Sequence, residues 1–291
     1  MRLKTYYPIP RFPPLSLSGA TCNLRCRHCD ATYLGGMLPA ETPDALLAQC
    51  RALRQQGAVG VLLSGGSDRD GSLLNLAALT DAIRQAKQET GLIFNVHPGL
   101  IDADTAHRLA VDFASLDIPS DDVIRRVHGL DATTDDYIAA YHTLRAAGIP
   151  VVPHVTVYRG DEARLLRPLA AGDAPSVIVV IVFSPTRATP LAEAAAPEPD
   201  AVAEVVARIR AQFPAAEIAL GCMRPRARAL RAAIEIAALQ AGVTRMAVPA
   251  QATLRHAEDA GYAIAAFDAC CALPAARESA AIRGDRLRKS E

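Results

Sequence analysis

Short β-branched runs alternate with amphipathic helical stretches along almost the whole chain. This alternation is typical of parallel βα units, because a parallel strand pair needs a crossover about as long as a helix. Glycines 57, 91, 148 and 242 stand where four of the helical stretches should end. The predicted strands are residues 15–20, 59–63, 92–96, 113–118, 151–157, 177–183, 217–220 and 246–248, and the main predicted helices are residues 43–56, 74–90, 134–147, 201–213 and 226–241.

Eight predicted strands make a complete or nearly complete (β/α)8 TIM-like barrel the expected α/β fold. A chain of 291 residues is long enough to bury the core of one such domain. We therefore expect a single barrel domain at residues 1–273. Residues 274–291 are polar and rich in Arg and Lys, and we expect them to form a C-terminal tail.

Charge and hydropathy exclude several classes of partner. The chain has 31 Lys and Arg against 31 Asp and Glu, so it carries no general field for nucleic acid or anionic lipid. No apolar run reaches the ~18 residues typical of a membrane helix. The first residues also lack the apolar segment of a signal peptide. We expect a cytoplasmic protein that binds neither nucleic acid nor membrane.

Three cysteines, Cys22, Cys26 and Cys29, follow the first predicted barrel strand, and His28 directly precedes the third. Three thiolates this close in sequence can hold three irons of a 4Fe–4S cube and leave the fourth iron open for chemistry. A structural zinc would need a fourth ligand, and the nearest candidate is His28. A disulfide framework is disfavoured because the three cysteines are crowded and odd in number. The spacing therefore favours an iron–sulfur cluster.

The CxxxCxxC spacing, the aromatic residue at position 28 and the place after the first strand resemble the radical S-adenosylmethionine (SAM) superfamily. In that family the open iron binds SAM, and one electron from the cluster cleaves SAM to a 5′-deoxyadenosyl radical. The run from Ser64 to Ser67 resembles the family's Gly-Gly-Glu, with Ser67 in place of the acid. Either Ser67, Asp68 or backbone carbonyls would then receive the methionine ammonium. The alternative for Gly65 and Gly66 is a plain turn between strand and helix.

Polar residues at the ends of the other barrel strands are further candidates, because barrel active sites lie at the C-terminal ends of the strands. Each of them either holds the ribose or methionine of SAM, as the resemblance implies, or closes the barrel mouth by hydrogen bonds. Asp121 and Asp122, which follow Pro119 and Ser120, are instead expected at a helix start. The candidate SAM-binding residues are His28, Ser64, Gly65, Gly66, Ser67, Asn95, His97, Asp117 and His154.

A second group of cysteines comes late in the chain. Cys222 follows the seventh predicted strand, and Cys270 and Cys271 follow a strand-like run at residues 262–266. If they meet at the top of the barrel, they can hold an auxiliary iron–sulfur cluster. The alternative is that they are small buried hydrophobes, the role expected of Cys50 in an amphipathic helix. Arg224 either serves this cluster or the substrate, or pairs with an acid at the rim.

Taken together, residues 16–30, 63–67 and 221–225 and the closing Cys-Cys pair resemble the smaller partner of the two-protein lipoyl synthases. This resemblance implies insertion of sulfur into a protein-bound octanoyl-lysine, with the auxiliary cluster as sulfur donor. It also implies three partners: an octanoylated lipoyl-carrier protein, a second radical SAM lipoyl synthase component, and an electron donor such as ferredoxin or flavodoxin.

Two other functions stay open. One is a radical SAM enzyme that modifies another peptide or a cofactor and uses its second cluster for electron transfer or substrate anchoring. The other is a non-catalytic iron–sulfur accessory subunit, which only Ser67 favours.

Overall fold

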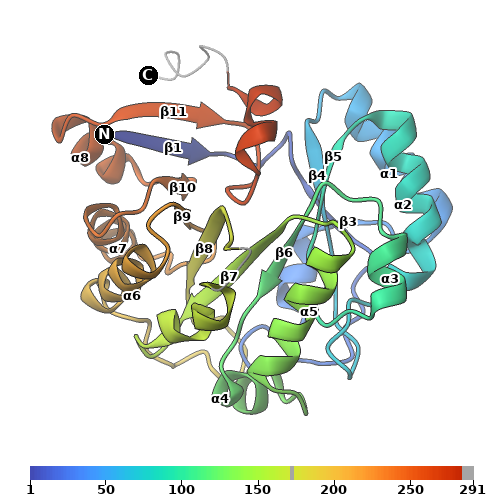
Figure 1. Ribbon diagram of the computed structural model, residues 1–291, viewed down its shortest axis with the longest axis horizontal. Helices are drawn as coiled ribbons and strands as arrows, with labels where there is room; N and C mark the ends of the chain where they lie inside the picture. Colours follow the sequence, from blue (N-terminus) through green and yellow to red (C-terminus); the bar gives the residue numbers. More distant parts are fainter. Residues whose placement is uncertain (171–173, 284–291) are drawn as a thin grey trace.

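The computed structural model describes residues 1–170 and 174–283, which form one curled parallel sheet with helices along its outer side (Figure 1). Its 11 strands run in the order β11-β1-β10-β9-β8-β7-β6-β5-β4-β2-β3. The strands are β1 (Arg2–Tyr6), β2 (Pro14–Ser16), β3 (Leu38–Pro39), β4 (Gly60–Ser64), β5 (Ile93–Val96), β6 (Phe113–Asp117), β7 (Val151–Val157), β8 (Val177–Val182), β9 (Glu217–Leu220), β10 (Arg245–Ala247) and β11 (Ala263–Phe267).

The sheet has two edges, β3 and β11, so the barrel that it forms is open rather than closed. Every pair of neighbouring strands is parallel, as βα units require. The predicted α/β fold of TIM-like type is confirmed. Parallel strands bring all their C-terminal ends to one end of the barrel, which places the predicted site residues together.

Strand β1 was not predicted. It lies between β10 and β11, so the first residues of the chain complete the C-terminal side of the sheet (Figure 1). Its sequence alternates basic and apolar residues over only five positions, which is a weak strand signal. Leu3 is fully buried, whereas the Lys4 ammonium pairs with Glu217 and Glu278 at 2.8 and 2.9 Å.

The helices confirm the five predicted main segments with small shifts at their ends. Gly91 and Gly242 follow helices in the left-handed region, at φ 61° and 115°, where glycine costs least. Ser120 caps the predicted helix start at Asp121 by accepting the Val123 N–H. The helices are α1 (Pro43–Gln55), α2 (Leu76–Thr90), α3 (Ala103–Arg108), α4 (Asp121–Val123), α5 (Thr134–Ala146), α6 (Pro199–Gln212), α7 (Arg228–Gln240) and α8 (Gln251–Asp259).

Two separate cores stabilise this arrangement. The larger one packs the helices against the outer face of the sheet and includes Cys50, which is fully buried as predicted. The smaller one contains no residue of the α-helices and fills the barrel interior with side chains such as Phe113, Val152 and Val179. Cys271 and Leu273 belong to this inner core, so the C-terminal segment enters the barrel.

Part of the predicted C-terminal tail is folded. Residues Ala275–Ala281 form a 3-10 helix, η4, and Ile282 forms an antiparallel bridge with Phe267 of β11. Residues 284–291 lie outside the described residues. Within the described residues, no helix has both the length and the apolar character that crossing a membrane requires.

Candidate functional site

The loop that carries the first three cysteines is held by backbone hydrogen bonds to two other segments. The carbonyl oxygen of Ser67 accepts the N–H groups of Asn23 and Leu24 at 2.9 and 3.2 Å, and the Cys22 thiol lies 3.8 Å from it. Val127 accepts the N–H of Arg27 at 2.8 Å. The loop is thereby fixed to the end of β4 on one side and to the segment after α4 on the other.

Gly66 lets these segments come together. A Cβ atom at this position would stand 2.0 Å from the carbonyl oxygen of Thr21 and 2.6 Å from the Cα of Cys22. No side chain fits at such distances. A close approach of the segment after β4 to the cysteine loop therefore requires glycine here, which the plain-turn alternative does not account for, while the predicted approach of Gly66 to SAM stays a prediction.

The three thiols lie around one cavity. All three line it, and the Cys26 thiol hydrogen-bonds with Cys29. This hydrogen bond lowers the pKa of Cys29 to about 7 and raises that of Cys26, whose burial raises it further. The donor set therefore consists of three soft sulfurs, the ligand type that iron–sulfur clusters require, and Cys29 is the thiol whose pKa is lowered.

The cavity has a volume of about 270 Å³ and opens beside these thiols. Seven of the nine predicted SAM-binding residues line it: His28, Ser64, Gly65, Gly66, Ser67, His97 and Asp117. The remaining two, Asn95 and His154, are buried behind its wall. Asn95 bonds Ser115, and His154 packs its ring edge-on against His97, with ring centroids 5.1 Å apart.

Two buried polar atoms at the cavity have no hydrogen-bond partner among the described residues, namely Nδ1 of His28 and Oδ1 of Asp117. A buried polar group without a partner costs free energy, so both atoms are suited to a polar ligand. Asp117 is the single acid among the described lining residues. Desolvation by burial lowers the pKa of His28, so its imidazole is neutral.

Ser67, and not Asp68, faces the cavity. The Asp68 carboxylate accepts hydrogen bonds from the Asn23 side chain and the Arg69 N–H at 2.9 and 2.8 Å, and these lower its pKa. It does not line the cavity. Of the groups considered for the methionine ammonium, Ser67 and backbone carbonyls remain.

Several lining residues had no sequence signal. Tyr33 belongs to the 3-10 helix η1 (Thr32–Gly36) after the cysteine loop, and its hydroxyl lies 2.7 Å from that of Thr186 across the barrel mouth. His128 ends a π-helix, Ile124–His128, and its ring lies 6.1 Å from that of His28. Burial lowers the pKa of His128 to about 4. π-Helices are frequent at functional sites, but no residue pattern predicted one here.

The late cysteines lie near one another, with Cys271 in the inner core, Cys270 packed against that core and Cys222 exposed. The Cys271 thiol donates a hydrogen bond to Cys270, which raises the pKa of Cys271 and lowers that of Cys270. Desolvation of its thiol and the nearby Cys270 raise the pKa of Cys222, whose residue as a whole is exposed. The amide of Asn95 lies 4.0 Å from the Cys270 sulfur. All seven cysteines of the chain are free thiols.

Arg224 pairs with an acid, as one of its predicted alternatives states, although this acid, Glu235, is fully buried rather than at the rim. The Arg224 side chain is 1% exposed, and its Nε donates to Glu235 at 2.8 Å. The other guanidinium nitrogens donate to the carbonyls of Gly221, Ala247 and Val248. All three guanidinium nitrogens therefore donate, and together they tie the loop after β9 to α7 and to the end of β10.

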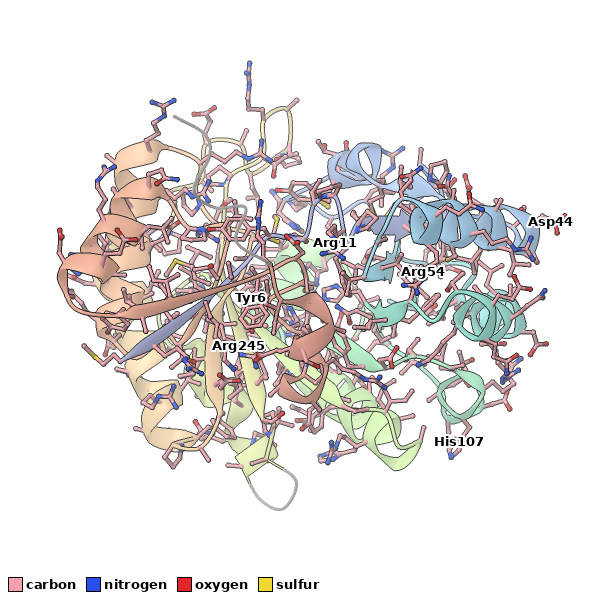
Figure 2. The ribbon with its side chains drawn as sticks, turned by 90° about the horizontal axis from the view of Figure 1, so that it is seen from above. Tyr6, Arg11, Asp44, Arg54, His107 and Arg245 are labelled. Atoms are coloured by element: carbon pink, nitrogen blue, oxygen red, sulfur yellow. The ribbon has the colours of Figure 1, made fainter. Side chains whose placement is uncertain are left out.

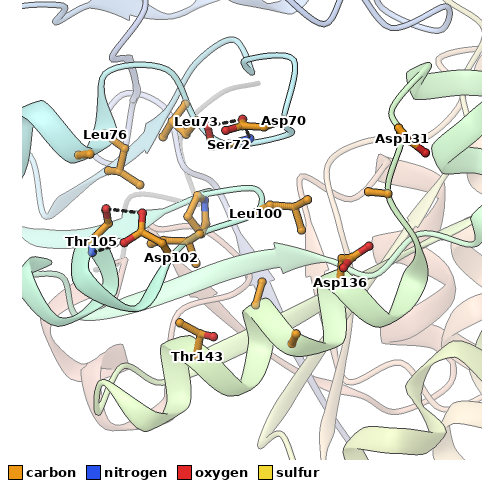
Figure 3. A pocket seen from close by; sticks show the side chains of 16 residues that line it. Asp70, Ser72, Leu73, Leu76, Leu100, Asp102, Thr105, Asp131, Asp136 and Thr143 are labelled. Carbon is orange, nitrogen blue, oxygen red and sulfur yellow. Dashed lines mark hydrogen bonds between the residues drawn. The ribbon is translucent and has the colours of Figure 1, made fainter.

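A separate cavity of about 550 Å³ lies outside the barrel between α2, α3 and α5 (Figure 3). Four aspartates line it, and three of them have structural tasks. Asp102 caps α3, Asp136 completes the capping box of α5, and Asp70 accepts from Ser72. Asp131 is the fourth. This cavity is distinct from the one at the cysteines.

Residues 17–163 match the model of the radical SAM superfamily. The protein belongs to this superfamily. The matched region contains the parts that line the cavity, namely the three-cysteine loop and the ends of β4, β5 and β6. No curated protein matches the chain by sequence.

Solved structures of radical SAM proteins share the fold. Methylornithine synthase (PylB) has a TM-score of 0.59 at 18% identity, over 84% of this chain and 72% of PylB. The FeFe-hydrogenase maturase HydG from Carboxydothermus hydrogenoformans has a TM-score of 0.61 at 19% identity, over 90% of this chain and 67% of HydG. Streptococcus suis SuiB bound to S-adenosylmethionine has a TM-score of 0.54 at 11% identity, over 86% of this chain and 58% of SuiB.

Superfamily membership implies a 4Fe–4S cluster and SAM, and the cavity suits both. Cys22, Cys26 and Cys29 would hold the cluster, and the lining residues would hold SAM. Among the described residues, no three His, Cys, Asp or Glu side chains converge where one metal ion could bind. Three thiolates of a 4Fe–4S cluster need not do so, because each binds a different iron.

Proposed function

We propose that this radical SAM protein inserts sulfur into protein-bound octanoyl-lysine, as one component of a two-protein lipoyl synthase. One observation supports the proposal: the structure brings Cys222 near Cys270 and Cys271 of a distant segment, and Cys270 lies 4.0 Å from the Asn95 amide in the barrel wall. Cysteines that only fill a core have no reason to meet. Three converging thiols fit the ligands of an auxiliary iron–sulfur cluster that gives up sulfide.

A short chain of contacts links the SAM cavity with Cys270, which supports action of both sites on one substrate. The Asn95 amide donates to the hydroxyl of Ser115, which lines the SAM cavity, at 3.0 Å, and lies 4.0 Å from the Cys270 sulfur. When bound, the first cluster and SAM supply a radical that removes hydrogen from an unactivated methylene. The barrel residues between the sites would hold the alkyl chain and exclude water from it.

The same proposal includes the partners. The substrate would be an octanoylated lipoyl-carrier protein, a second radical SAM component would add the other sulfur, and ferredoxin or flavodoxin would supply electrons. A reducing cytoplasm would keep the seven thiols free.

The test is sulfur insertion into an octanoyl-lysine peptide by the anaerobically reconstituted protein, followed by mass spectrometry. We expect a monothiolated octanoyl product from this protein alone and lipoyl-lysine when the partner is added. Complete lipoyl formation by this protein alone would contradict the division of labour. Cleavage of SAM without thiolation, with or without the partner, would contradict the function.

Counting the sulfide in the protein before and after turnover distinguishes a second cluster that donates sulfur from one that serves electron transfer or substrate anchoring. A donor cluster loses sulfide with each product formed, whereas a cluster for electron transfer or anchoring keeps it. An accessory subunit would neither bind nor cleave SAM.

A further inference from the structure

A buried arginine at the floor of the barrel holds the loop of the late cysteines. Arg245 lies on β10, and its side chain is 0% exposed. One guanidinium nitrogen donates to the carbonyl oxygens of Cys271 and Leu273, at 3.3 and 2.6 Å. Arg245 therefore contacts the backbone at Cys271 and again two residues after it.

The guanidinium is itself fixed by two acids from different parts of the chain. Glu217 of β9 accepts from its Nε at 2.9 Å, and Glu278 of η4 pairs with it at 2.8 Å. Lys4 of β1 also pairs with both acids, and the Tyr6 hydroxyl donates to Glu278 at 2.7 Å. Figure 2 shows Arg245 and Tyr6 next to each other, and the guanidinium carbon lies 5.5 Å from the centre of the Tyr6 ring.

Packing alone does not explain this group. Burying charges is costly, and well-packed apolar side chains often stabilise a protein at least as well as a buried ion pair. What an arginine offers in addition is a rigid fork of donors that fixes the positions of several acceptors at once. Here the acceptors are the carboxylates of Glu217 and Glu278 and the two carbonyls of the cysteine turn.

We propose that Arg245 is the positioning residue of the second cysteine site. It fixes the turn at Cys271 and Leu273 so that Cys270 and Cys271 face Cys222, and η4 supports it through Glu278. This inference rests on the proposed function, because it assumes that the late cysteines hold a cluster.

The test compares Arg245→Lys with Arg210→Lys after anaerobic reconstitution. Lysine keeps the positive charge but loses the fork. Arg210 is a matched control because it also donates to backbone carbonyls, those of Pro214, Ala216 and Gly242, and has no contact with the cysteine turn. We expect iron to fall from ~8 to ~4 per chain in Arg245→Lys, with loss of the second cluster's electron paramagnetic resonance signal, and to stay at ~8 in Arg210→Lys.

The outcomes are separable. Wild-type protein with only ~4 irons would overturn both the auxiliary cluster and the role of Arg245. Wild-type and Arg245→Lys proteins with ~8 irons each and identical signals would overturn the positioning role alone.

If Arg245→Lys does not fold, Glu278→Gln provides the readout, because it keeps the side chain's shape and removes one charge that holds Arg245. We expect iron at the second site to be lost to a chelator about tenfold faster, with the first site unaffected. Equal rates at the second site in Glu278→Gln and wild type would overturn the proposal.

Discussion

The two cysteine sites face the same barrel but are built over very different sequence distances. Cys22, Cys26 and Cys29 lie within one loop, which backbone hydrogen bonds attach to Ser67 and Val127. Cys222 and Cys270 are separated in sequence by the whole of α7, β10, α8 and β11, and they lie near each other only because the chain folds back on itself. Buried ion pairs, rather than a local loop, hold the second site.

This difference determines how each site should fail. A local loop retains its ligand spacing when distant parts of the barrel are disturbed. A site assembled from distant segments depends on every contact that keeps those segments in register. We therefore expect the second site to be sensitive to substitutions that leave the first intact.

The largest expected effect comes from removing the cysteines themselves. Replacing Cys22, Cys26 and Cys29 with Ala should abolish formation of 5′-deoxyadenosine from SAM, because no protein ligand for the cluster remains. The matched variant with Cys222, Cys270 and Cys271 replaced should still cleave SAM. Each variant should retain ~4 irons per chain. Undiminished SAM cleavage in the first variant would contradict the assignment of Cys22, Cys26 and Cys29 as ligands of the cluster that cleaves SAM.

Breaking the buried ion pair beside Cys222 should have the next largest effect. Glu235 is fully buried and accepts from Arg224, Arg231, Thr253 and the Ala250 N–H. Glu235→Ala leaves the Arg224 charge buried without its acid, so the free energy of unfolding should fall by about 3–5 kcal/mol. Urea titration of the apoprotein measures it. The control is Arg231→Ala, whose side chain is 30% exposed and should matter much less. Equal losses in both variants would contradict the argument.

A methyl group at Gly66 should damage the first site in particular. The added Cβ would overlap Thr21 and Cys22, and relieving such overpacking costs roughly 1–3 kcal/mol. We expect at least a several-fold drop in SAM cleavage, with iron at the second site unchanged. Gly35→Ala is the control, because a Cβ there meets nothing within 4 Å. Normal SAM cleavage by Gly66→Ala would show that the loop does not need the close approach.

The smallest effect should come from breaking an exposed ion pair beside the first three cysteines. Arg25 and Asp30 pair at 3.2 Å, with side chains 63% and 49% exposed. Water screens such pairs, so Asp30→Ala should change the free energy of unfolding by less than about 1 kcal/mol. Thermal unfolding of the apoprotein checks this. If Asp30→Ala lowered the free energy of unfolding as much as Glu235→Ala, burial would not explain the difference expected between the Arg25–Asp30 and Arg224–Glu235 ion pairs.

Much of the fold was readable in the sequence because parallel βα units leave periodic signals. The long helices and the strands of the barrel wall carry continuous apolar runs, and these were predicted within a few residues. β1 was not, because five residues that alternate in character become a strand only when β10 and β11 lie on either side of them. The helix η4 was likewise not predicted, because its residues were assigned to a polar tail. Its position depends on the ion pairs of Glu278 with Lys4 and Arg245, which come from distant parts of the chain.

By itself, the sequence determined the superfamily signature, because the signature depends on residues close together in the chain. It also predicted Cys22, Cys26 and Cys29 as the cluster ligands, whereas the close approach of Gly66 to the cysteine loop was visible only in the structure. Only the tertiary structure decided which polar residues face the cavity. It placed His128 there and turned Asp68 away, and it set Arg224 against Glu235 rather than toward the cysteines. The physical reason is that side-chain direction depends on the packing of distant segments, which residue spacing along the chain does not record.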